Sequence, residues 1–182
     1  TGTCNGEFDL SKHSDTDWQN LLKSASVSGY LDLRGEYAQL TFPISYYKNN
    51  VSSPTDLLKA YDKMVWLEHD LMGLHKYNHT IKNRMFFHAI TDDGSYMYAT
   101  SYRTAYHVGT LNEILNVNKF KTSGIWGPAH EVGHMHQTRP GLKWVGTTEV
   151  TNNIHSLHVQ TTFGNRSRLI TENMGDGTTR FE

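Results

Sequence analysis

The chain has 182 residues, a formal net charge of −1 with neutral histidines, and an apolar content of 37%. This length is enough for one substantial domain with a core, and a charged content of only 19% excludes a disordered charged chain. No basic run stands out, so nucleic acid is not an expected partner. The apolar stretches are short and interrupted, so no transmembrane helix is expected.

The beginning of the chain is polar and is interpreted as a lead-in, residues 1–28, that carries a short helix over 17–25. Asp15 or Thr16 is the candidate cap of that helix. The first residues, TGTCNGEFDLSKHSD, lack the basic start and the apolar run of a signal peptide. Cys4 is the only cysteine, so it cannot form an internal disulfide. A free thiol is favoured there over a bond to a segment outside this chain.

Two β-hairpins are predicted in the first half of the chain. Residues 29–47 alternate apolar and polar side chains in two runs that Gly35 separates. Residues 84–90 and 95–103 are apolar or aromatic runs on either side of the turn sequence TDDG, which indicates a second hairpin. The sheet is therefore expected to be mostly antiparallel.

The longest predicted helix covers residues 52–74. Ser53 can cap it, Pro54 suits the first helical position, and apolar residues then follow at helical spacing. Further helices are predicted over 110–118, 124–138 and 147–164. Because strands come first and helices later, the pattern predicts an α+β fold.

The sequence GIWGPAHEVGHMHQTRP, residues 124–140, contains His130 and His134 four residues apart. On a helix, residues at this spacing lie on one face, so the two imidazoles can bind one ion. Glu131 lies about 100° around the helix, which suits a base that acts on metal-bound water without itself binding the metal. Eleven histidines raise the chance of an accidental pair. The helical context and a downstream glutamate nevertheless favour a zinc site.

A catalytic zinc ion needs a third protein ligand and one open position. A metzincin arrangement is excluded, because the places for its glycine and third histidine hold Gln137 and Pro140. Glu149, fifteen residues after His134, begins the next predicted helix, and the intervening RPGLKWVG can turn the chain back. A purely structural zinc site is disfavoured, since such sites close four ligands and usually use cysteine.

The other histidines have less definite roles. His136 is two residues from His134 and therefore points to a different face of the helix. His155 and His158 follow Glu149 and are candidates for contact with the ligands or with substrate, against the alternative of ordinary surface or core histidines. The remaining ones are expected to be structural: His69, His75, His79, His88 and His107.

The segments WGPAHEVGHMHQ and TTEVTNNIHSLHVQ resemble the peptidase M60 family, enhancin-like and mucin-active zinc metallopeptidases of the gluzincin group. LRGEYAQLTFPIS, DLLKAYDKMVWLEHDLMGL and MYATSYR resemble its upstream strand, helix and cleft segments. The resemblance covers about residues 30–164. It implies a gluzincin-like fold in which a sheet precedes the active-site helices. Residues 29–182 would then be the metallopeptidase domain, as a fragment of a longer protein.

The resemblance also implies roles for single residues. His130, His134 and Glu149 would bind zinc and Glu131 would be the catalytic base, while Asn153, one turn after Glu149, would orient His130. Members of the family are typically secreted or surface-attached and act on glycoproteins, often mucins. No oligomeric state follows from the sequence.

The expected function is a zinc endopeptidase acting on mucin-type glycoproteins. The alternative is a glycoprotein-binding module that keeps the zinc site without turnover, although Glu131 argues against it because a binder needs no base. Residues 94–103 are further predicted to be the sheet edge that holds an extended substrate. The alternative is a buried central strand whose tyrosines belong to the core.

Overall fold

A six-stranded sheet forms the centre of the protein in this computed structural model, which describes residues 4–25, 28–91 and 94–181. Its order is β1-β2-β3-β4-β6-β5. The strands are β1 (Glu7–Asp9), β2 (Tyr30–Arg34), β3 (Ala38–Pro43), β4 (Met85–Ile90), β5 (Met97–Ala99) and β6 (Thr104–His107). The helices are α1 (Asp15–Ser24), α2 (Ile44–Asn50), α3 (Pro54–Leu71), α4 (Leu111–Ile114), α5 (Val117–Phe120), α6 (Trp126–His136), α7 (Thr148–Thr162) and α8 (Arg168–Thr171), with a 3₁₀ turn, η1 (Val108–Thr110).

The predicted α+β class is confirmed, but the expectation of a mostly antiparallel sheet is wrong. The pairs β1–β2, β3–β4 and β4–β6 are parallel, and only β2–β3 and β5–β6 are antiparallel. Between β3 and β4 the chain passes through α2 and α3, and such a crossover returns it to the same end of the sheet. The sheet is therefore mixed.

The first predicted hairpin is confirmed, because β2 and β3 pair antiparallel on either side of Gly35. The prediction of a second hairpin is wrong, because β4 and β5 do not pair and β6 lies between them. Residues 92 and 93 of the expected turn lie outside the described residues. Thr104, Ala105 and Tyr106 of β6 are all buried, whereas β5 is only half-buried. A strand buried on both faces occupies an interior position, and the half-buried one is left at the edge.

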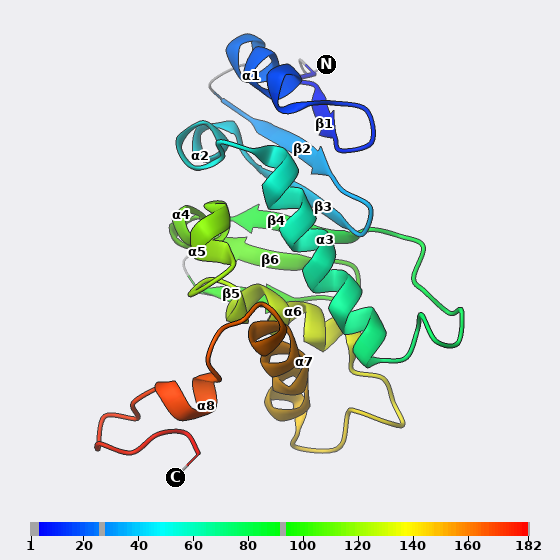
Figure 1. Ribbon diagram of the computed structural model, residues 1–182, viewed down its shortest axis with the longest axis vertical. Coiled ribbons are helices and arrows are strands. Elements are labelled where there is room, and N and C mark those ends of the chain that lie inside the picture. The colour runs from blue at the N-terminus through cyan, green and yellow to red at the C-terminus, as the bar shows by residue number, and fades with distance from the viewer. Residues whose placement is uncertain (1–3, 26–27, 92–93, 182) are drawn as a thin grey trace.

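The long helix α3 crosses one face of the sheet (Figure 1) and begins as predicted. The Ser53 side chain accepts a hydrogen bond from the backbone N–H of Asp56, and Pro54 is the first helical residue. The shorter helix α1 is capped by Ser14 instead of the predicted Asp15 or Thr16. The Ser14 hydroxyl accepts from the backbone N–H of Asp17, and the Asp17 carboxylate accepts from the backbone N–H of Ser14. This capping box accounts for the earlier start.

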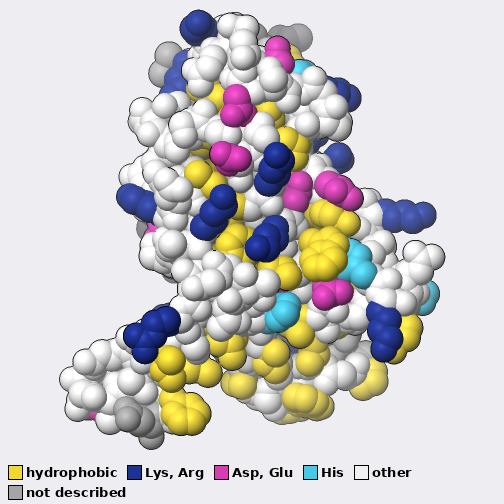
Figure 2. Space-filling view, in the orientation of Figure 1, with side chains coloured by type: hydrophobic (Ala, Val, Ile, Leu, Met, Phe, Trp, Pro, Cys, Tyr) yellow, Lys and Arg dark blue, Asp and Glu magenta, His cyan; other side chains and the backbone are white. Residues whose placement is uncertain are grey.

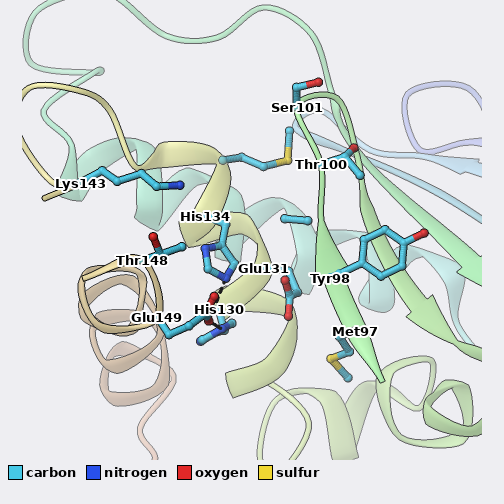
Figure 3. A pocket seen from close by; sticks show the side chains of 12 residues that line it. Met97, Tyr98, Thr100, Ser101, His130, Glu131, His134, Lys143, Thr148 and Glu149 are labelled. Atoms are coloured by element: carbon cyan, nitrogen blue, oxygen red, sulfur yellow. Dashed lines mark hydrogen bonds and ion pairs between the residues drawn. The ribbon is translucent and has the colours of Figure 1, made fainter. Parts of the chain in front are cut away.

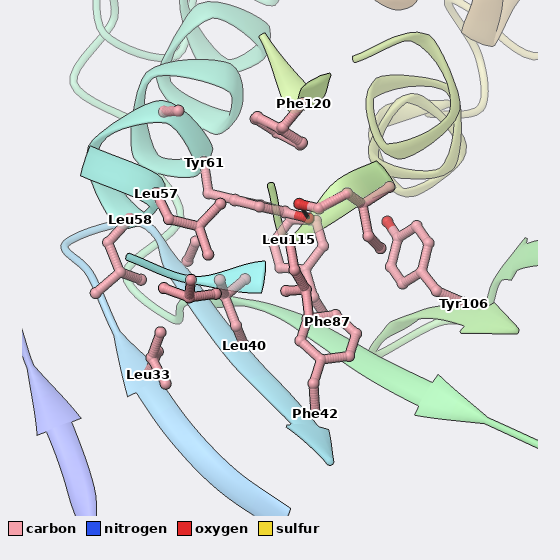
Figure 4. Close-up of a cluster of buried hydrophobic side chains, with 14 of the residues drawn as sticks. Leu33, Leu40, Phe42, Leu57, Leu58, Tyr61, Phe87, Tyr106, Leu115 and Phe120 are labelled. Carbon is pink, nitrogen blue, oxygen red and sulfur yellow. Dashed lines mark hydrogen bonds between the residues drawn. The ribbon is translucent and has the colours of Figure 1, made fainter. Parts of the chain in front are cut away.

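The hydrophobic core lies between α3 and the buried face of the sheet (Figure 4). Alternate residues of β2 to β4 point into it, and α3 covers them with Leu57, Leu58 and Tyr61. The ring of Tyr61 stacks on Phe120, with centroids 4.1 Å apart. Trp18 is also fully buried, so α1 contributes to the same core. This packing gives α6 and α7, which contact α3, a fixed support.

Candidate active site

The two histidines of the motif lie on one face of α6, as predicted. The rings of His130 and His134 have centroids 4.8 Å apart. Helix α6 ends at His136, before Pro140, and residues 137–147 lead back to α7. Glu149 lies in the first turn of α7. Because α6 and α7 pack directly on each other, the glutamate meets the two histidines.

The three side chains converge on one point (Figure 3). Oε2 of Glu149 lies 3.1 Å from Nε2 of His130 and 3.2 Å from Nε2 of His134. Ligands at zinc's usual bond lengths and tetrahedral angles would be about 3.3 Å apart. The glutamate side chain is 69% exposed and the histidine side chains are 20% and 17% exposed, so the cluster opens to solvent on one side. Two imidazoles and a carboxylate at these separations fit a zinc ion.

Amide side chains fix the orientation of both histidine rings. Oδ1 of Asn153 lies 2.7 Å from Nδ1 of His130, and Oε1 of Gln137 lies 3.1 Å from Nδ1 of His134. An amide oxygen only accepts, so in both rings Nδ1 donates and the lone pair of Nε2 faces Glu149. This is the protonation pattern that metal binding through Nε2 requires.

Two residues of this arrangement were missed in the sequence. Gln137 donates from Nε2 to the Thr148 carbonyl, 2.7 Å away, and so fastens the end of α6 to the start of α7. Its position three residues after His134 was the only local signal. Nδ2 of Asn152, which is fully buried, lies 2.9 Å from Nε2 of both motif histidines. The spacing of one turn after Glu149 pointed to Asn153, and no pattern in the sequence pointed to Asn152.

Glu131 lies beside the cluster in a confined environment and is only 6% exposed. Burial raises its pKa to about 7, with the Glu149 carboxylate adding to the rise and His130 opposing it. A cation held by the neighbouring ligands would act in the lowering direction. Glu131 is therefore a buried carboxyl group directly beside the cluster.

The other predicted histidines do not reach this region. His155 is fully buried and faces Glu68 on α3, so it has no path to a substrate. His136 is also buried and points away from His134, as expected from the spacing. His158 is partly buried and lines neither hollow beside the cluster.

Two hollows flank the cluster, and Met97, His130 and Glu131 line both of them. The first has a volume of about 760 Å³ and lies between β5 and the three converging side chains (Figure 3). The second, of about 860 Å³, includes Val150 and Ile154 of α7 in its wall. Figure 2 shows hydrophobic side chains gathered over α7 and α8 at this end of the molecule. The two hollows adjoin at these shared residues and are together called the groove below.

Strand β5 is the edge of the sheet, so the predicted edge position of this segment is confirmed and the central-strand alternative is wrong. The N–H of Thr100 donates to a carbonyl at the start of β6, and the carbonyl of Tyr96 accepts from its end. Hydrogen bonding alternates along an antiparallel pair. The backbone groups of Met97 and Ala99 therefore point away from β6, on the open side of the sheet.

A glycine within the motif allows α6 and α7 to approach closely. A Cβ at Gly133 would lie 2.8 Å from the backbone oxygen of Asn152. Gly133→Ala is therefore expected to push the helices apart, to lower the free energy of unfolding by about 1–3 kcal/mol and to weaken metal binding by displacing Glu149. Denaturant unfolding and metal titration measure the two effects.

Gly127→Ala is the matched control for that change. Its nearest obstacle is Sδ of Met97, 2.6 Å from the added Cβ, which belongs to a flexible side chain that can move aside. This variant should therefore lose less stability than Gly133→Ala. Equal stability and equal metal affinity of Gly133→Ala and the parent chain would contradict the argument.

Comparison with known proteins agrees with this geometry. A family model described as "Peptidase M60, enhancin and enhancin-like" matches residues 7–180. The chain belongs to the peptidase M60 family. The resemblance drawn from residues 30–164 is thereby confirmed, and the match also takes in β1 and α1, which precede that range.

Solved structures and curated relatives of this M60 domain are longer than the chain. A Bacillus anthracis protein, described as functionally unknown and conserved, is 38% identical with a TM-score of 0.85 over 92% of this chain and 36% of its own. A metallopeptidase in complex with Tn antigen is 29% identical with a TM-score of 0.79, over 98% and 34%. A TRPM8 channel-associated factor homolog of Xenopus laevis is 29% identical over 73% of this chain and 14% of its own. The chain thus spans about a third or less of each relative.

None of the helices in the described ranges is long and apolar enough to cross a membrane.

Proposed function

We propose that the chain is the catalytic part of a zinc-dependent endopeptidase. The observation that carries this proposal is the convergence of His130, His134 and Glu149 beside a buried Glu131, in a groove bordered by an open strand edge. Zinc, when bound, supplies Lewis-acid chemistry that polarises the scissile carbonyl and acidifies water.

The residues of the chain then have distinct tasks. His130, His134 and Glu149 hold the ion, and Asn153 keeps the first of these rings in its binding tautomer. The Glu131 carboxylate takes a proton from the attacking water and returns it to the leaving nitrogen.

Strand β5 is proposed to bind the substrate backbone. A polypeptide added to an open edge gains main-chain hydrogen bonds without requiring a particular side-chain sequence. The outward N–H and C=O groups of Met97 and Ala99 are placed to bind a substrate backbone. Their strand, β5, lines the groove beside His130 and Glu131. An extended peptide along β5 would pass the proposed zinc ion.

Replacing Ala99 with proline tests this role. The substitution removes one outward N–H but no bond to β6, so cleavage is expected to fall about tenfold, the value of one hydrogen bond. Folding and metal content should remain. Ala99→Ser keeps the backbone donor and should cleave like the parent chain. Thr100→Pro would break the bond to β6 and is expected to destabilise the sheet instead.

The substrate is proposed to be a protein with mucin-type O-glycans, met at the cell surface or outside the cell. The family resemblance supports this class, and so does the related metallopeptidase whose structure contains Tn antigen. Incubation with a mucin-type glycopeptide, with and without a chelator, is the direct test. Cleavage should occur only without chelator and should exceed that of the same peptide without its glycan. Cleavage that is insensitive to the chelator would reject the zinc mechanism.

A glycoprotein-binding module without turnover is the second candidate. The curated amphibian relative is named for association with a channel and not for proteolysis, which keeps this candidate open. Glu131 favours the peptidase, because binding alone gives no use for a buried base beside the ligands. Retention of the glycopeptide without any cleavage would favour the module.

A further inference from the structure

A second group of two histidines and a glutamate lies inside the protein, where α3, α6 and α7 pack together. Glu68 comes from α3, His136 from α6 and His155 from α7. All three are at most 3% exposed. His136 is on the opposite side of α6 from His134, so this group lies behind the candidate active site and faces no part of the groove.

The donor atoms of this group are spaced as closely as those of His130, His134 and Glu149 in the candidate active site. Oε2 of Glu68 lies 2.9 Å from Nδ1 of His136 and 3.3 Å from Nδ1 of His155. The corresponding separations around Glu149 are 3.1 and 3.2 Å. Nδ1 of His155 makes no hydrogen bond to Glu68 in spite of this proximity. Nδ1 of His155 is thus a buried donor atom without a partner, directed at the same oxygen as Nδ1 of His136, and a metal ion would supply that partner.

The Glu68 carboxyl group meets few polar partners. The carboxylate is fully buried, and among the ion pairs of the described residues it meets only these two histidines. Burial disfavours the ionised form of a carboxyl group, and a divalent cation bound to it would favour that form.

The remaining oxygen of Glu68 can complete the coordination. Oε1 is buried and has no hydrogen-bond partner. A carboxylate that uses both oxygens, together with two imidazoles, supplies four donor atoms without solvent. Such a site would have no open position for water or substrate, so its role would be structural, although it lacks the cysteines that structural zinc sites usually use.

We propose that Glu68, His136 and His155 form a second, structural metal site for zinc or a similar divalent transition metal. The ion ties α3 to α6 and α7, the two helices that carry the candidate active-site ligands. On the side away from the groove, the ion therefore keeps α6 packed against α7. Its binding does not depend on the ligands of the open cluster.

Metal content per chain, measured after gel filtration with a chelator-free buffer, tests the proposal. The parent chain should hold two equivalents of zinc, His134→Ala one, Glu68→Gln one, and the double variant none. The ion left in His134→Ala should resist brief exposure to a chelator, because it is enclosed. His88→Gln, which alters a histidine on β4 outside both groups, should keep two.

The outcomes separate the two sites. His134→Ala without any metal, or Glu68→Gln with the parent's content, would overturn the buried site. Glu68→Gln can also unfold the chain. The metal content of His134→Ala is therefore a sufficient test on its own, because this variant leaves all three buried residues intact. A parent chain with one ion that survives in His134→Ala but is lost in Glu68→Gln would support the buried site and refute the proposed active site.

Discussion

His134→Ala is expected to abolish cleavage of a glycopeptide substrate. The ring supplies one of the two nitrogens that lie 3.1 and 3.2 Å from Oε2 of Glu149. Loss of a residue that merely orients a ligand weakens metal binding by about 10–100-fold. Loss of the ligand itself should therefore cost more than about 100-fold. Zinc titration, followed by cleavage assays at saturating zinc, measures both effects.

His158→Ala is the matched control for this variant. His158 is also a partly buried histidine, on α7, but it lines neither hollow. Its removal should leave zinc affinity at the groove and cleavage near the parent's values. If His134→Ala bound zinc at the groove with the parent's affinity, the assignment of the ligands would be wrong.

Glu131→Gln is expected to lose cleavage while it keeps its metal. Glutamine has nearly the same shape as glutamate but cannot take up a proton from water. The loss should be roughly 10²–10⁴-fold, the range for a positioned proton-transfer group. Cleavage rate, zinc content and glycopeptide affinity should be measured on the same preparation.

The combination of results distinguishes the candidate functions. Normal zinc content and normal glycopeptide affinity with lost cleavage would identify Glu131 as the base. Loss of metal in Glu131→Gln would instead make Glu131 a ligand and contradict the mechanism. A parent chain that binds the glycopeptide and does not cleave it would favour the binding module.

Local sequence patterns were sufficient for the elements that depend on near neighbours. The cap and first residue of α3 follow from hydrogen bonds within one turn, and the pairing of β2 with β3 follows from a short turn at Gly35. The four-residue spacing of His130 and His134 likewise fixes their common face, because helical geometry relates them directly. Glu149 could also be proposed as a ligand from the sequence, because only a loop separates its helix from α6.

The order of the strands depended on burial that no short segment reveals. Residues 104–107 follow the expected hairpin and gave no strong strand signal, yet β6 takes the place beside β4. Its first three residues are buried, whereas β5 is half-buried and lies at the edge of the sheet. The groove and its open backbone groups are consequences of this arrangement.

By itself, then, the sequence determined the α+β class, the helix with its paired histidines and the resemblance to the M60 family, because periodicity and motif spacing are local properties. Only the tertiary structure decided the mixed sheet, the roles of Gln137 and Asn152, and the meeting of Glu68 with His136 and His155. Glu68 is 68 residues from His136. Contacts at such separations form only when helices pack on a common core, and no interaction between neighbouring residues specifies them.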